Sequence, residues 1–136
     1  MIYITRRERF SAAHRMYRKE WTDEKNLRVF GKCSNPNWHG HNYVLYVTVK
    51  GEPADDLGFF ININSLKQII KEKIIDKIDH KNLNVEVGFM QGRIATTENL
   101  AIAIWDELKP AVEKEGAALH CIKVEETENN SIEYYG

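Results

Sequence analysis

The order of strand-like and helix-like patterns along the chain is the feature that most restricts its fold. Alternating apolar residues at 2–10 and 41–50 predict two strands, and the similar segments 118–127 and 131–135 predict two more. Two helix-like segments lie between these pairs. Because the strands are segregated from the helices, we predict an α+β fold with an antiparallel sheet. A length of 136 residues suits one domain, placed at residues 1–136.

The two helices are predicted from apolar residues that recur at helical spacing. The first begins at Ser65 and Gln68, which match a capping box, and its buried stripe consists of Leu66, Ile70, Ile74 and Ile78. The second begins after Thr96 or Thr97, is kinked or shortened by Pro110, and is expected to stop at Gly116. Residues 17–38 are mostly polar and are interpreted as a long ordered loop of the kind that often carries function.

Composition excludes several classes of protein. A hydrophobic content of 43% argues against disorder, and 19 basic against 20 acidic residues give no basic excess for binding nucleic acid. No apolar run approaches the roughly 18–20 residues that span a bilayer. The first residues lack the pattern of a signal peptide, so we expect a cytoplasmic protein with reduced cysteines.

Histidines form the sharpest local pattern. His39 and His41 flank Gly40 in a strand-like segment, so both side chains point to one face and two imidazoles can converge on a metal ion. His14 follows the first strand and lies near them if the first two strands pair. Three imidazoles with an open fourth position are typical of catalytic zinc. The alternative is that all three are exposed histidines in loops or at strand ends.

Cys33 lies six residues before His39 in a polar segment, which argues against burial as a small apolar residue. Two interpretations stay open: a fourth zinc ligand in a structural site, or a nucleophile or base held beside the metal. Cys121 lies within a predicted strand and is interpreted as a core residue.

Two further candidate functional positions each contain an acidic residue. Asp79 and His80 follow the first helix, and such a pair can take a proton from a thiol, although a plain surface location is the alternative. Glu126 shares a face with Ile122 and Val124, where a carboxylate needs a partner such as the donor edge of an aminopyrimidinone ring. An exposed strand end is the alternative there.

Five motifs in register make the chain resemble a known family over nearly its whole length. They are Phe10-Ser11-Ala12-Ala13-His14, Cys33 with His39-Gly40-His41-Asn42-Tyr43, Asp79-His80-Lys81-Asn82-Leu83-Asn84, Thr96-Thr97-Glu98-Asn99, and Glu126-Thr127. The sequence is similar to 6-pyruvoyl-tetrahydropterin synthase and to its relative in queuosine biosynthesis, 6-carboxy-tetrahydropterin synthase.

The resemblance implies a role for each candidate. Zinc would be held by His14, His39 and His41. Cys33 would be the base, supported by Asp79 and His80, and Glu126 would grip the pterin ring with Thr96 and Thr97 near the substrate.

The implied architecture is the tunnelling fold (T-fold), a four-stranded antiparallel sheet with two helices on one face. Family members form trimers whose sheets close into a barrel, and two trimers stack into a homohexamer. Their active sites lie between subunits, so the resemblance implies that one chain does not hold a complete site.

The segment 26–37 and the gap between Cys33 and His39 look like the 6-pyruvoyl branch, whereas Trp38 stands where the family usually has a small residue. The implied activity is a lyase reaction of tetrahydrobiopterin biosynthesis that converts 7,8-dihydroneopterin triphosphate into 6-pyruvoyl-tetrahydropterin with loss of triphosphate. The alternatives are 6-carboxy-tetrahydropterin synthesis and a non-catalytic zinc- or pterin-binding protein. Candidate cations for the triphosphate are Arg15, Arg28 and Lys32.

Overall fold

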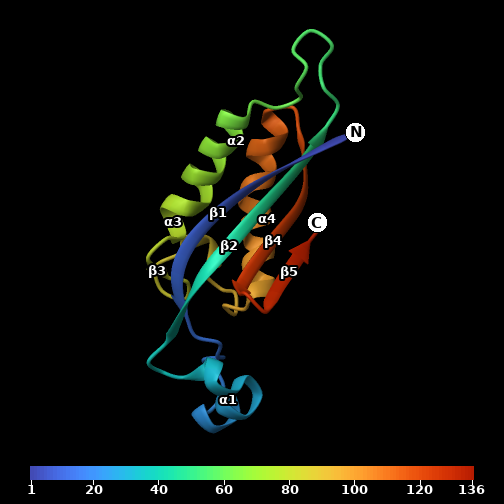
Figure 1. Ribbon diagram of the computed structural model, residues 1–136. Helices are drawn as coiled ribbons and strands as arrows, with labels where there is room; N and C mark the ends of the chain where they lie inside the picture. Colours follow the sequence, from blue (N-terminus) through green and yellow to red (C-terminus); the bar gives the residue numbers. More distant parts are fainter.

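A curved five-stranded sheet forms one layer of the protein, and helices cover one of its faces (Figure 1). The computed structural model describes all residues, 1–136. The strands lie in the order β3-β1-β2-β4-β5. Their bounds are β1 Ile2–His14, β2 His39–Gly51, β3 Lys81–Asn82, β4 Ala118–Thr127 and β5 Asn130–Tyr134.

The predicted α+β class and the four antiparallel strands are present, but the prediction of only four strands is wrong. The fifth, β3, is two residues long and pairs in parallel with β1, so the sheet is mixed. Local sequence could not predict β3, because so short a strand depends on hydrogen bonds to the free edge of β1 rather than on its own pattern.

The long antiparallel pair of β1 and β2 positions the candidate site. Its register runs from Ile2 opposite Gly51 to His14 opposite His39. Phe10 on β1 and Leu45 on β2 are buried beneath the helices, whereas the alternate residues face away from them. The helix-covered face of this pair therefore carries both the apolar core and, at its end, the histidines.

The helices on the sheet are α2 Ile63–Ile70, the π-helical turn η2 Lys71–Ile75, α3 Asp76–Ile78 and α4 Thr97–Lys114. The first of these begins two residues earlier than predicted, because the side chain of Asn62 accepts the hydrogen bond from Asn64 and caps it. The predicted cap at Thr96 is confirmed, and α4 continues for four residues past Pro110. None of the helices is both long and apolar enough to cross a lipid bilayer.

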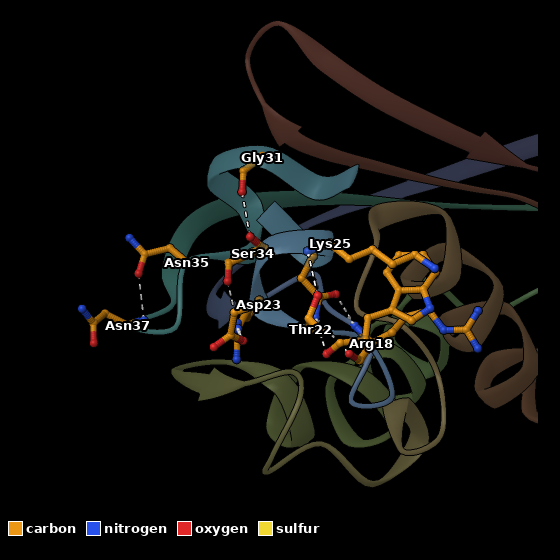
Figure 2. A network of polar contacts seen from close by, with 11 residues as sticks. Arg18, Thr22, Asp23, Lys25, Gly31, Ser34, Asn35 and Asn37 are labelled. Atoms are coloured by element: carbon orange, nitrogen blue, oxygen red, sulfur yellow. Dashed lines mark hydrogen bonds and ion pairs between the residues drawn. The ribbon is translucent and has the colours of Figure 1, made fainter. Parts of the chain in front are cut away.

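Residues 17–38 are not the loop that their polar composition predicts. They contain α1 Asp23–Phe30 and the 3₁₀ turn η1 Gly31–Ser34, and α1 lies beyond the end of the sheet (Figure 1). Thr22 caps α1 by accepting a hydrogen bond from the backbone of Lys25, as Figure 2 shows. Gly31, with φ of 58°, ends α1 in a conformation that favours glycine. The remaining 3₁₀ turn, η3, spans Gly88–Met90.

Candidate metal centre and active site

Three imidazoles converge at the end of the β1–β2 pair. Their potential ligand atoms, one each from His14, His39 and His41, all lie within 4.8 Å of one another. The Nε2 atoms of His14 and His41 are 3.1 Å apart. Two nitrogens bound to one tetrahedral zinc ion lie about 3.3 Å apart, since each Zn–N bond is about 2.0–2.1 Å long. The cluster therefore fits a metal ion of that size.

The chemistry of the nitrogens supports the same conclusion. His14 is buried, and its Nδ1–H donates to the carbonyl of Ala95 at 2.7 Å, which leaves Nε2 with its lone pair. Nδ1 of His39 is buried without a hydrogen-bond partner. Burial lowers the pKa of both His14 and His41, so the neutral form that binds metals is favoured.

Glu126 lies beside this cluster at the end of β4. One carboxylate oxygen is 3.3 Å from Nε2 of His41, and the other accepts a hydrogen bond from the hydroxyl of Thr97. Thr96 uses its own hydroxyl to cap α4, accepting from the backbone N–H of Asn99 at 3.2 Å. Glu126 and Thr97 thus belong directly to the candidate site, whereas the hydroxyl of Thr96 is engaged in the helix cap.

Cys33 is held near the histidines by η1. Its carbonyl accepts a hydrogen bond from the N–H of Met16, two residues after His14, at 2.8 Å. The next residue, Ser34, donates its hydroxyl to the carbonyl of Gly31 and so closes the turn (Figure 2). The sulfur of Cys33 is not among the clustered metal-ligand atoms. Cys33 is a free cysteine close in the fold to the histidine cluster, and its sulfur lies outside that cluster.

Arg15 connects the turn η1 with Asn84 through hydrogen bonds. Its Nε–H donates to the carbonyl of Ser34 at 2.7 Å, and its backbone exchanges two hydrogen bonds with the side chain of Asn84. The guanidinium also stacks on the ring of Tyr17. Only 14% of the Arg15 side chain is exposed, so it acts mainly as a clamp on the turn that carries Cys33. The other two candidate cations, Lys32 and Arg28, are exposed.

Asp79 and His80 do not join the cluster within this chain. Both attach to the β3-side edge of β1: the N–H of Ser11 donates to Oδ1 of Asp79, and the N–H of His80 donates to the carbonyl of Ser11. Oδ1 of Asp79 is also 3.0 Å from Nδ1 of His80. No hydrogen bond or ion pair links the pair to Cys33 or to the other histidines. A depression of about 460 Å³ opens beside His80, lined also by Ser11, Gly40 and Asn42.

Tyr43 is a member of the cluster that the sequence interpretation did not select. Its ring centroid is 5.5 Å from that of His41 and 6.3 Å from that of His14. Burial raises the pKa of its hydroxyl, and the nearby charges of Glu126 and Cys33 raise it further. The spacing of two residues from His41 on one strand is the signal that could have identified it.

Trp38, directly before the first strand histidine, adopts a φ of 66°. This left-handed conformation favours glycine and is uncommon for a bulky residue. Trp38 is therefore held in a constrained backbone conformation directly before His39.

Comparisons with known proteins agree with this geometry. The family model described as 6-pyruvoyl tetrahydropterin synthase matches residues 3–136. The 6-pyruvoyl tetrahydrobiopterin synthase of Dictyostelium discoideum is 48% identical over 135 residues, which cover 99% of this chain and 96% of the relative. The solved structure of the Caenorhabditis elegans 6-pyruvoyl tetrahydropterin synthase superposes with a TM-score of 0.92 at 36% identity, covering 99% of this chain and 95% of that one.

The other branch is more distant. The 6-carboxy-5,6,7,8-tetrahydropterin synthase of Bacillus subtilis is 32% identical over 97 residues, which cover 69% of this chain and 62% of the relative. The full-length matches, the shared fold and the three-histidine cluster lead to one conclusion: this chain belongs to the 6-pyruvoyl tetrahydropterin synthase family.

Proposed function

We propose that the protein is a zinc-dependent lyase that converts 7,8-dihydroneopterin triphosphate into 6-pyruvoyl-tetrahydropterin and triphosphate. The observation that carries this proposal is the convergence of three imidazoles, with a cysteine nearby whose sulfur is not among the clustered ligand atoms. The Dictyostelium relative at 48% identity is named a 6-pyruvoyl tetrahydrobiopterin synthase, which supports the same product. The shorter and weaker match to the 6-carboxy branch makes that product the second choice.

Each side chain has a distinct part in the proposed reaction. Zinc, when bound by His14, His39 and His41, would supply Lewis-acid polarisation of the substrate's side-chain oxygens. Cys33 takes up a proton from a side-chain carbon, a general-base step worth about 10²–10⁴-fold in rate. The ring is reduced as the side chain is oxidised, so the conversion needs no separate oxidant or reductant.

Glu126 and Thr97 bind the other end of the substrate in this proposal. A carboxylate presents two acceptor oxygens, and an aminopyrimidinone ring presents two adjacent N–H donors. In the free protein one oxygen of Glu126 accepts from Thr97 and the other lies near His41. Thr97 therefore orients the carboxylate that receives the pterin, and Thr96 contributes mainly by starting α4 at this point.

The complete site is proposed to contain two copies of the chain. Asp79 and His80 lie on one edge of β1, whereas His39 and His41 lie on β2 along its other edge. A second copy would bring its own Asp79–His80 pair to Cys33, where the imidazole can accept the thiol proton and Asp79 can orient the ring. This arrangement agrees with the proposed T-fold homohexamer built from two trimers, acting in the cytoplasm.

The proposed activity is tested by incubating the purified protein with 7,8-dihydroneopterin triphosphate and identifying the product by mass spectrometry. We expect 6-pyruvoyl-tetrahydropterin and free triphosphate. A carboxylated pterin as the sole product would instead assign the protein to the other branch.

Cys33→Ala separates an enzyme from a zinc-binding protein. We expect the variant to keep its zinc, measured by atomic absorption, and to lose turnover by at least about 10²-fold. Cys121→Ala is the matched control, because the second thiol lies in β4 and is not part of the site. Loss of zinc in Cys33→Ala would identify the thiol as a fourth ligand and contradict its role as base.

A further inference from the structure

The segment 94–99 links the candidate metal centre to the start of α4. Within it, the carbonyl of Ala95 accepts a hydrogen bond of 2.7 Å from the Nδ1–H of His14. The other two histidines have no such support, since Nδ1 of His39 lacks a partner and His41 contacts only side chains. The position of the Ala95 carbonyl therefore sets which nitrogen of His14 faces the cluster and how its ring is turned.

Burial makes this hydrogen bond difficult to replace. Ala95 and His14 are each 1% exposed, so water does not reach the two partners. If the carbonyl moved away, the imidazole would keep a buried N–H without an acceptor, or it would turn and displace the nitrogen that faces the other histidines. The orientation of the Ala95 peptide group is therefore part of what holds the metal centre in shape.

A three-residue turn centred on Ala95 fixes this orientation. The N–H of Thr96 donates to the carbonyl of Ile94 at 2.8 Å and closes the turn. The same carbonyl accepts a second hydrogen bond, also of 2.8 Å, from the side-chain Nδ2–H of Asn99 in the first turn of α4. The side chain of Asn99 therefore anchors the turn to the helix.

The backbone of Asn99 has a separate role. Its N–H donates to the hydroxyl of Thr96 at 3.2 Å and completes the cap of α4. Truncation of the side chain removes the hydrogen bond to Ile94 but leaves this cap in place. The anchor of the turn can therefore be removed by a substitution that keeps the start of the helix.

We propose that Asn99 is a positioning residue for the metal centre: it holds the turn whose central carbonyl, that of Ala95, orients His14. This inference rests on the zinc site of the proposed function. The hydrogen bonds of Asn99 reach none of the three histidines directly. Residues that orient a metal-bound histidine contribute about 10–100-fold to metal affinity, and we expect about tenfold because Asn99 acts through the turn.

Asn99→Ala tests the inference, with Asn64→Ala as its matched control. Asn64 lies in the first turn of α2, is exposed, and forms no hydrogen bond through its side chain. The dissociation constant for Zn²⁺ is measured on the metal-free proteins, well below their Tm, by competition with a chromophoric chelator. We expect Asn99→Ala to bind Zn²⁺ about tenfold more weakly and Asn64→Ala to match the unmodified protein. Equal affinity in Asn99→Ala would overturn the inference.

A second variant and the melting temperature separate positioning from a general structural role. Asn99→Asp keeps the size of the side chain, and its charge suits the first turn of a helix, but it has no N–H to donate. It should also bind Zn²⁺ more weakly than the unmodified protein. If both variants had a lower Tm without metal but bound Zn²⁺ normally when folded, Asn99 would only stabilise α4, and the inference would be wrong.

The unmodified protein distinguishes failure of this inference from failure of the proposed function. We expect it to bind Zn²⁺ and to be stabilised by the ion, with a higher Tm. If the unmodified protein binds Zn²⁺ and both Asn99 variants bind it equally well, only the role of Asn99 is overturned. If the unmodified protein does not bind Zn²⁺, the proposed zinc-dependent function fails and the inference about Asn99 fails with it.

Discussion

The histidine cluster and the Asp79–His80 pair are two candidate parts of one site, but their environments differ sharply. His14 is buried and hydrogen-bonded to Ala95, and the other two ligands are partly covered. His80, in contrast, has 82% of its side chain exposed, and its polar contacts are with Asp79 and with the carbonyl of Ser11 on β1. A single chain is enough to assemble the histidine cluster, whereas the Asp79–His80 pair is exposed at the surface and separate from it.

The difference follows from which side of β1 each part uses. His14 points from β1 to the helix-covered face and meets two residues of the neighbouring strand β2. Asp79 and His80 come at the end of α3 and attach to the opposite edge of β1, next to β3. A sheet edge and its exposed residues are available to another molecule, whereas the covered face is not. The comparison therefore predicts that metal binding is a property of one chain and catalysis a property of an assembly.

Removal of a metal ligand should have the largest effect. In His41→Ala we expect the zinc bound per chain to fall by more than about tenfold and activity to fall with it, because two imidazoles hold the ion far less firmly than three. Metal analysis after dialysis is the measurement. His120→Ala is the control, since His120 packs between Tyr3 and Tyr135 away from the cluster. Retention of zinc by His41→Ala would show that the three histidines are not the metal site.

Refolding two inactive variants together tests whether Cys33 and the Asp79–His80 pair of one active site come from different chains. Cys33→Ala and His80→Ala are each expected to be inactive alone, and their co-assembly should create some sites with an intact thiol from one chain and an intact His80 from another. Random association at equal amounts restores about one quarter of the sites. The measurement is the rate of product formation after the two variants are unfolded and refolded together.

The control for this mixture is the double variant Cys33→Ala/His80→Ala refolded with the unmodified protein. If each site used residues of one chain only, the two single variants would recover no activity when mixed. That result would require Asp79 and His80 to reach Cys33 within one chain, contrary to their attachment at the far edge of β1.

Residues whose positions follow from local periodicity were predictable. His39 and His41 share a face because strand side chains alternate, and His14 joins them because β1 and β2 pair across the segment between them. Strand β4 has the bounds predicted from its alternation, Ala118–Thr127, and Thr96 caps α4 as its hydroxyl and position indicate.

Features that depend on tertiary contacts were missed. Helix α1 has no apolar stripe to reveal it, since Leu27 and Val29 are both exposed. Instead Asn26 is buried and fixes the helix through hydrogen bonds to Arg18. The placement of Cys33 beside the metal centre likewise depends on the contact of η1 with Met16, which no sequence pattern reports.

The smallest predicted effect concerns the Asp79–His80 pair alone. The hydrogen bond from the Ser11 N–H, followed by the interaction with His80, lowers the pKa of Asp79. When the pKa of a carboxyl group is lower in the folded state than in the unfolded state, the ionised group stabilises the folded protein. This stabilisation is fully present above the pKa of the unfolded state, about 3.9, and is lost as the pH falls through the pKa of the folded state. Asp79→Asn should therefore lower the urea midpoint slightly at pH 7, and the difference should narrow below about pH 4.

The effect is small because the pair is exposed to solvent, where water screens the charges. Urea unfolding followed by circular dichroism between pH 3 and 7 measures it. Asp55→Asn is the control, because that exposed carboxylate forms no hydrogen bond or ion pair and its loss should leave the midpoint unchanged. A difference for Asp79→Asn that widened on acidification would contradict the prediction, because it would mean that folding raises the pKa of Asp79 instead of lowering it.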